Sequence, residues 1–211
     1  MNLPDLQTLA IEPLDGGIAV LRVNRPDRMN AQTVTMFREY GIAARTLRDS
    51  GLRALILTGA GDRAFCAGFD LDELDAITRL GVREFLKFLQ TAAGGITAIR
   101  HLPFTLSRLV GPGRAAEIGY TGRVVGAEEA VRIGLANRVV PSERLFDEAL
   151  AMATAIAAHP AGGVRRSKRA IQRNQEITSF AAALELENRG QALLTRTGDL
   201  PAALAARAGQ R

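Results

Sequence analysis

The segment Ala64-Phe65-Cys66-Ala67-Gly68-Phe69-Asp70-Leu71 links an apolar run to an acidic one. The apolar run, residues 54–58 (ALILT), carries no charge and lies between Gly51 and Gly59, which is typical of a strand buried on both faces. Four carboxylates follow where a helix is expected to begin, since free N–H groups and the helix dipole favour negative charge there: Asp70, Asp72, Glu73 and Asp75. We therefore predict a strand-to-helix connection over residues 59–70.

Upstream of this connection, the pattern predicts strands over residues 8–13 and 18–23. The turn residues Asp15-Gly16-Gly17 between them indicate a hairpin, and a helix is expected over 33–49. Downstream, only helices are expected, over residues 82–100, 113–118, 127–133, 142–158, 163–174, 180–194 and 200–207. The chain thus begins with strands and helices together and continues with helices alone. This order indicates a mixed α/β core with a helical C-terminal part.

Composition narrows the classes of partner. Of the 211 residues, 47% are hydrophobic, enough for a core, yet no apolar run reaches the length of a membrane span, so we expect no membrane partner. The net charge of +5 is mostly scattered arginine, and with two tyrosines and no tryptophan we expect no nucleic acid. The N-terminal residues show no signal-peptide pattern, and a cytoplasmic location is expected. Cys66, as the only cysteine, cannot form an internal disulfide.

Three stretches together resemble one family. They are residues 24–31 (NRPDRMNA), residues 64–71 (AFCAGFDL), and residues 109–141, which include LVGPGRAAE, YTGR, AEEA and GLANRVVP. In this order they resemble the enoyl-CoA hydratase/isomerase (crotonase) family. The resemblance implies an α/β fold of repeated ββα units over residues 1–140 and a helical oligomerisation region over 141–211, with assembly as a homotrimer or hexamer.

The resemblance also implies a site. Enzymes of this family, which serve fatty acid metabolism, pass through a thioester enolate whose oxygen is held by two backbone N–H groups. Here the first donor would be the amide of Phe69, and Gly68 would allow close approach of the thioester. A neighbouring strip and one basic side chain would receive coenzyme A: Ala64, Cys66, Ala67, Asp70, Leu71 and Arg28. The coenzyme A thioester is the substrate, and no separate cofactor or metal is expected.

The sequence departs from the family between about Pro103 and Leu106. The family normally has two strands, a glycine-rich turn and a helix there, so about 45–50 residues are absent, a large share of a single domain. That block would supply the second oxyanion donor and the acidic groups that move protons. Either the protein has residues here that this sequence omits, which we favour because both flanking motifs are intact, or the chain is truly shortened. A shortened chain would be an inactive acyl-CoA binder or a self-assembling remnant, and whether it is an enzyme stays open.

Several of these residues also have plainer interpretations. Gly68 and Phe69 could form only a strand-to-helix turn. Cys66 could be a small buried apolar residue, and the acidic set could mark only the start of a helix. Glu117 and Glu129 are interpreted as structural. His101 and His159 have no metal-ligand spacing. The basic cluster at residues 165–169 is interpreted as a solvated helix face, with contact to coenzyme A phosphates as the alternative.

Overall fold

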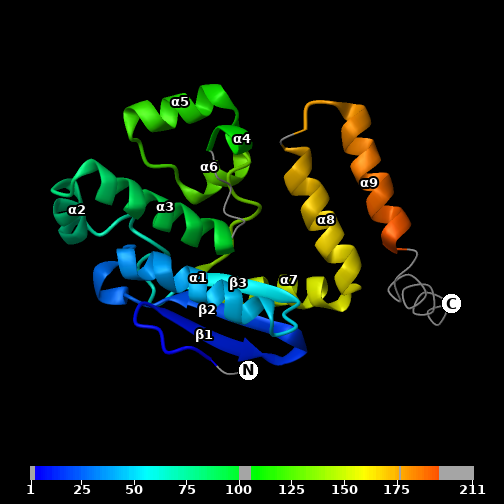
Figure 1. Ribbon diagram of the computed structural model, residues 1–211, viewed down its shortest axis with the longest axis horizontal. Coiled ribbons are helices and arrows are strands. Elements are labelled where there is room, and N and C mark those ends of the chain that lie inside the picture. The colour runs from blue at the N-terminus through cyan, green and yellow to red at the C-terminus, as the bar shows by residue number, and fades with distance from the viewer. Residues whose placement is uncertain (1–2, 100–105, 176, 195–211) are drawn as a thin grey trace. The chain divides into compact units, whose positions relative to one another are not determined.

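The computed structural model describes residues 3–99, 106–175 and 177–194. The described strands are β1 (Leu9–Leu14), β2 (Ile18–Val23) and β3 (Ala54–Gly59), and the first α-helix lies between β2 and β3. The α-helices are α1 (Val34–Arg48), α2 (Leu71–Thr78), α3 (Val82–Ile99), α4 (Leu106–Val110), α5 (Pro112–Thr121), α6 (Ala127–Arg132), α7 (Leu145–Ala158), α8 (Ala161–Asn174) and α9 (Phe180–Leu194) (Figure 1). Short 3₁₀ turns lie at Asp15–Gly17, Pro26–Arg28 and Ser142–Arg144. The expected mixed α/β class is confirmed, while the expected helix at 200–207 lies outside the described residues.

The strands form one sheet in the order β1-β2-β3. β1 and β2 are the predicted hairpin, whose turn contains Gly16 and Gly17 at φ of 71° and 74°. The two hydrogen bonds from Arg53 N to Gly17 O and from Ala60 N to Val23 O show that β2 and β3 run parallel, with α1 as the crossover. The core follows β2, in which five of the six residues are buried.

The prediction that β3 is buried on both faces is wrong. Ile56 is buried, but every other residue of β3 is only half-buried. Among the described strands β3 pairs with β2 alone and therefore lies at an edge of the sheet. Its apolar sequence fits a central strand, and its burial is that of an edge strand because no described neighbour covers its second side.

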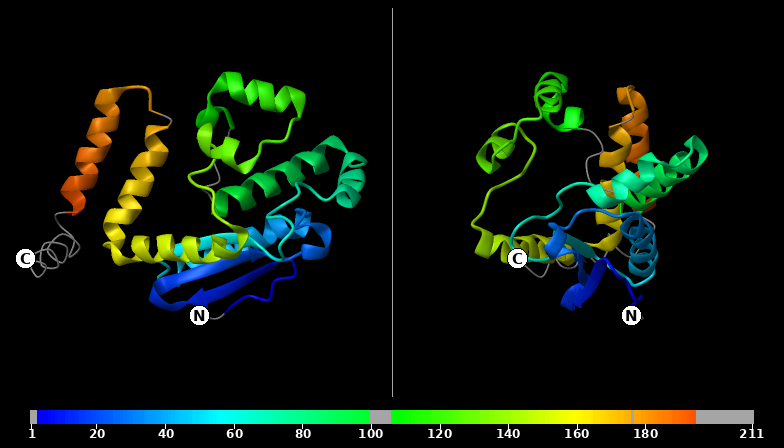
Figure 2. Two further views of the ribbon diagram at one scale, coloured as in Figure 1. Left: turned by 180° about the vertical axis from the view of Figure 1, so that it is seen from behind. Right: turned by 90° about the vertical axis from the view of Figure 1, so that its left-hand side faces the viewer.

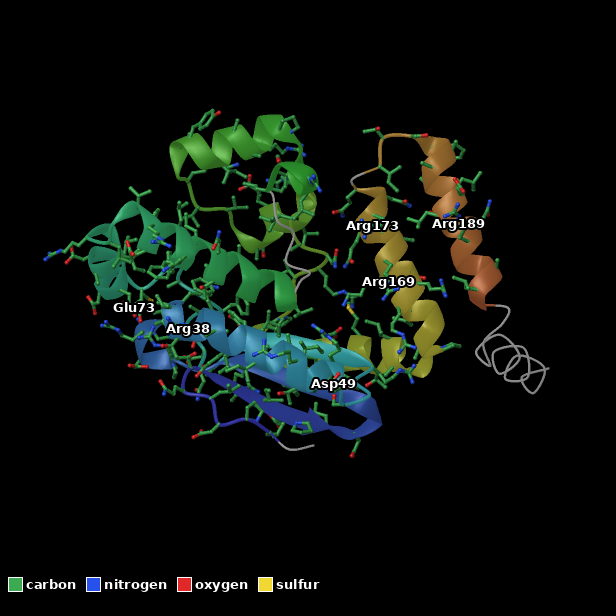
Figure 3. All side chains as sticks on the ribbon, viewed as in Figure 1. Arg38, Asp49, Glu73, Arg169, Arg173 and Arg189 are labelled. Atoms are coloured by element: carbon green, nitrogen blue, oxygen red, sulfur yellow. The ribbon has the colours of Figure 1, made fainter. Side chains whose placement is uncertain are left out.

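α1 packs against α3, and the two helices run side by side in both Figures 1 and 2. Thr33 caps α1 by accepting a hydrogen bond from the N–H of Met36 at 3.0 Å. Glu73 also accepts from the N–H of Val34 at 2.8 Å, so a carboxylate of α2 lies at the positive end of α1 (Figure 3). The helices approach closely at Gly95, where a Cβ atom would overlap the backbone of Phe37.

The chain divides into two compact units. The first contains residues 1–12, 20–51 and 57–149, and the second contains 13–19, 52–56 and 150–211. Two short pieces of the sheet thus group with the C-terminal helices, and the boundary at 140/141 stays a prediction. In the second unit α8 and α9 form a helical hairpin (Figure 2), in which Asn174 donates to Glu187 at 2.8 Å. None of the described helices is long and apolar enough to cross a bilayer.

Candidate functional site

Within the first unit, the fully buried side chain of Asn30 joins the loop after β2 to the loop that leads into the segment from Ala64 to Leu71. Its amide nitrogen donates to the carbonyl oxygens of Ala60 (2.9 Å) and Ala64 (2.7 Å), and its oxygen accepts from the N–H of Arg25 (3.0 Å). Gly59 makes room for this contact, because a Cβ atom there would lie 2.7 Å from both Asn30 Nδ2 and Ala64 O. The loop after β3 is therefore fixed by buried polar contacts.

The backbone on either side of Phe69 pairs with Gln32. The N–H of Gln32 donates to Gly68 O at 2.8 Å, and the N–H of Asp70 donates to Gln32 O at 2.9 Å, which forms an isolated parallel bridge. In such a bridge the amide of the middle residue points away from the partner strand. The N–H of Phe69 accordingly has no acceptor among the described residues and belongs to no extended ladder.

Gly68 gives this amide its direction. Its φ of 98° lies in the region that side chains avoid, although a Cβ atom would meet nothing within 4 Å. Backbone conformation, and not lack of space, therefore requires glycine at this position. Gly68 is also exposed, so solvent or a ligand can approach the backbone next to Phe69.

An aromatic cluster holds the ring of Phe69. The ring stacks on Phe37 of α1 with centroids 6.1 Å apart, and it meets Phe88 of α3 edge-on at 5.5 Å. Phe85 extends the cluster, 6.1 Å from Phe88. Such aromatic pairs each contribute on the order of 1 kcal/mol beyond the area they bury. The ring thus ties the segment to the α1–α3 pair.

Asp70 combines two structural roles. It caps α2 by accepting from the N–H of Asp72 at 3.1 Å, and its buried carboxylate pairs with Arg25 at 2.8 Å. The hydrogen bond from Arg25 is the main reason that the pKa of Asp70 is lowered, and the N–H of Asp72 and the charge of Arg28 act in the same direction. This confirms the interpretation of the acidic set as the start of a helix.

Arg28 lies at the rim of the same segment. Its guanidinium pairs with Asp72 and lies 3.7 Å from Asp70, and about half of the side chain is exposed. The hydrogen bond to Asp72 is the main reason that the pKa of Arg28 is raised. Arg28, which is predicted to contact the phosphates of coenzyme A, therefore already has carboxylate partners. Leu71, 77% exposed, starts α2 beside it.

Cys66 is half-buried, so its interpretation as a buried apolar residue is only partly right. Its sulfur lies 3.4 Å from the N–H of Gly68 and 3.7 Å from Gly68 O. Burial raises the pKa of Tyr40 to about 12, the nearby Cys66 adds to this increase, and a hydrogen bond with Gln32 partly opposes it. The Tyr40 hydroxyl is therefore neutral at physiological pH. The other predicted members of the strip are half-buried Ala64 and exposed Ala67, whose N–H donates to Met29 O at 3.0 Å.

The sequence reasoning missed two positioning residues, Asn30 and Gln32. Asn30 stands in the quoted motif of residues 24–31, so its place there was the available signal. Glu117 and Glu129 are structural as interpreted, since Arg123 bridges both: it binds Glu129 through two nitrogens, at 2.9 and 3.0 Å, and Glu117 at 2.8 Å. His101 lies outside the described residues.

The basic cluster of α8 is extended by Arg173, four residues after Arg169 on the same helix (Figure 3). Arg165 and Arg169 are exposed, which agrees with a solvated face.

The backbone carbonyl of His159 accepts a hydrogen bond from the side chain of Arg53. In the part of the chain that the structure describes, no group of three or more metal-ligating side chains could hold an ion.

Comparison with known proteins identifies the family. The enoyl-CoA hydratase/isomerase family model matches residues 14–87 and 83–201. This chain belongs to that family. YngF of Bacillus subtilis is 30% identical over 219 residues, covering 82% of this chain and 84% of its own. The short-chain-enoyl-CoA hydratase of Clostridium acetobutylicum is 29% identical over 229 residues, covering 86% and 88%. The enoyl-CoA hydratase structure from Mycobacterium smegmatis has a TM-score of 0.86 at 26% identity and covers 97% of each chain.

The alignment lengths show that this chain is shorter than the members of the enoyl-CoA hydratase/isomerase family that it matches. The match to YngF covers 219 residues, but 82% of 211 residues is only about 173, so about 46 aligned positions have no residue here. The family model matches in two stretches, which overlap at residues 83–87. The shortage agrees in size with the predicted missing block. The predicted junction itself falls on residues 100–105, outside the described residues.

Proposed function

We propose that this family member binds an acyl-CoA thioester with its carbonyl oxygen at the N–H of Phe69. The observation that supports this most is the amide of Phe69, which has no acceptor among the described residues and points outward between two backbone hydrogen bonds with Gln32. A fixed donor aimed at developing negative charge can stabilise an enolate by about 3–4 kcal/mol, judged from the loss of a single oxyanion donor. The half-buried and exposed backbone from Ala64 to Gly68 would lie along the coenzyme A moiety, and Arg28 would reach its phosphates.

The activity proposed is that of an enoyl-CoA hydratase or isomerase that acts on a short-chain enoyl-CoA and passes through its thioester enolate. Short chains are suggested by the similarity to the Clostridium short-chain-enoyl-CoA hydratase. A second candidate is binding without turnover. It is favoured by the shortage of about 46 residues relative to YngF, because a single donor without proton-transferring acids loses most of the catalysis. We further propose assembly as a homotrimer or hexamer through the C-terminal helices.

Calorimetric titration with crotonyl-CoA, run beside a hydration assay on the same protein, tests the proposal. Binding with hydration supports the enzyme, and saturable binding without hydration supports the second candidate. Gly68→Ala should weaken binding at least 10-fold, since alanine disfavours the φ that aims the amide of Phe69. Gly51→Ala is the matched control, because Gly51 also has a positive φ (74°) and open space for a Cβ atom but lies in a remote turn. Absence of saturable binding to the wild-type chain would overturn both candidates.

A further inference from the structure

The two edges of the sheet differ in chemistry. β1 carries Glu12 and Pro13, both exposed, and Glu12 forms an ion pair with Arg22 at 3.6 Å. Charged residues and proline are the usual protection of an edge strand against pairing with another chain. β3, at the opposite edge, reads Ala-Leu-Ile-Leu-Thr-Gly and has neither. Its sequence is that of a strand with neighbours on both sides.

The second side of β3 has no partner among the described residues. Its flanking backbone bonds, Arg53 N to Gly17 O and Ala60 N to Val23 O, both run toward β2. Leu55, Leu57 and Thr58 are half-buried, so part of their surface remains available. An open row of N–H and C=O groups between apolar side chains is satisfied best by another extended strand.

We propose that β3 pairs with the β3 strand of a second copy of this chain, side by side and antiparallel. Each copy presents the same uncharged edge, so a two-fold contact satisfies both edges and places no like charges opposite each other. The pairing is proposed for the 211-residue chain, which lacks the block expected between about Pro103 and Leu106 and is about 46 aligned positions shorter than its match to YngF requires. The pairing does not depend on acyl-CoA binding.

Light scattering over a range of micromolar concentrations tests the pairing with two matched variants. Leu55→Lys places a charge on β3, and Ile11→Lys makes the same change at a half-buried position of β1. We expect Leu55→Lys to have half the mass of Ile11→Lys, whatever assembly the C-terminal helices add, and Ile11→Lys to match the wild type. Circular dichroism checks that both variants fold, and Thr58→Lys replaces Leu55→Lys if the latter does not.

Hydrogen exchange provides a second readout, since the amides of residues 54–59 should exchange more slowly as the wild-type concentration rises. Equal masses for the β3 and β1 variants would overturn the pairing. A wild-type chain that stays monomeric at all concentrations would also overturn it. Association only after addition of the Clostridium short-chain-enoyl-CoA hydratase would do the same, because the partner of β3 would then be another protein and not a second copy of this chain.

Discussion

Asn30 and Ala64 are joined by a 2.7 Å hydrogen bond from the Asn30 amide to the Ala64 carbonyl oxygen. The two residues stand 34 positions apart, and the bond connects the loop after β2 to the start of the segment from Ala64 to Leu71. Asn30 adopts a φ of 56°, a left-handed conformation that asparagine tolerates better than most residues. Both its backbone and its side chain are thus suited to this position.

Replacing Asn30 with alanine should lower the free energy of unfolding by about 2–4 kcal/mol, because it removes three hydrogen bonds of a buried side chain and leaves partly buried groups of Arg25, Ala60 and Ala64 without these partners. Urea denaturation measures the change. Asn24→Ala is the matched control, since the Asn24 side chain is exposed and only its backbone N–H bonds, to Thr8 O. It should change stability by less than about 0.5 kcal/mol. Equal effects of the two substitutions would contradict the anchoring role of Asn30.

The local features of this fold were predictable from sequence, whereas those set by distant partners were not. The hairpin turn, the start of α1 after Thr33 and the acidic start of α2 follow from residues within a few positions of one another. The half-burial of β3 depends on which strand lies beside it. The burial of Asn30 depends on its contacts with Ala60 and Ala64. The residues around Asn30, taken alone, predict only a polar loop. The orientation of the Phe69 amide likewise depends on Gln32, 37 positions earlier.

The ion pair of Asp70 should make stability depend on pH. Its folded pKa is lowered, chiefly by the hydrogen bond from Arg25, so the carboxylate contributes stability that is complete above its ordinary pKa of 3.8 and is lost as the pH falls through the lower folded value. Asp70→Asn should remove this part of the acid sensitivity below about pH 4. Denaturation midpoints measured across acidic pH test this, with exposed Asp62→Asn as control. An unchanged profile for Asp70→Asn would refute the linkage.

Two adjacent glycines of α3 should respond oppositely to alanine. A Cβ atom at Gly95 would overlap the carbonyl oxygen of Phe37 and lie 3.0 Å from its carbonyl carbon, so Gly95→Ala must push α3 away from α1. We expect a loss of about 1–3 kcal/mol. At Gly94 nothing lies within 4 Å, and Gly94→Ala should add up to about 1 kcal/mol through helix propensity. Thermal unfolding of the pair decides this, and destabilisation by both would show that the close contact is not the cause.

The pairing of Arg28 with Asp72 should compete with the proposed binding of coenzyme A phosphates. Because Asp72 neutralises part of the Arg28 charge, Asp72→Asn should leave the guanidinium freer and tighten crotonyl-CoA binding by about 2–5-fold at low salt, the range of an exposed ion pair. Arg28→Ala should weaken binding instead, and both effects should shrink at high salt as screening increases. Calorimetry measures the three affinities, with Asp62→Asn as a charge-matched control. If Asp72→Asn weakened binding, Asp72 would be orienting Arg28 for the ligand and the competition would be wrong.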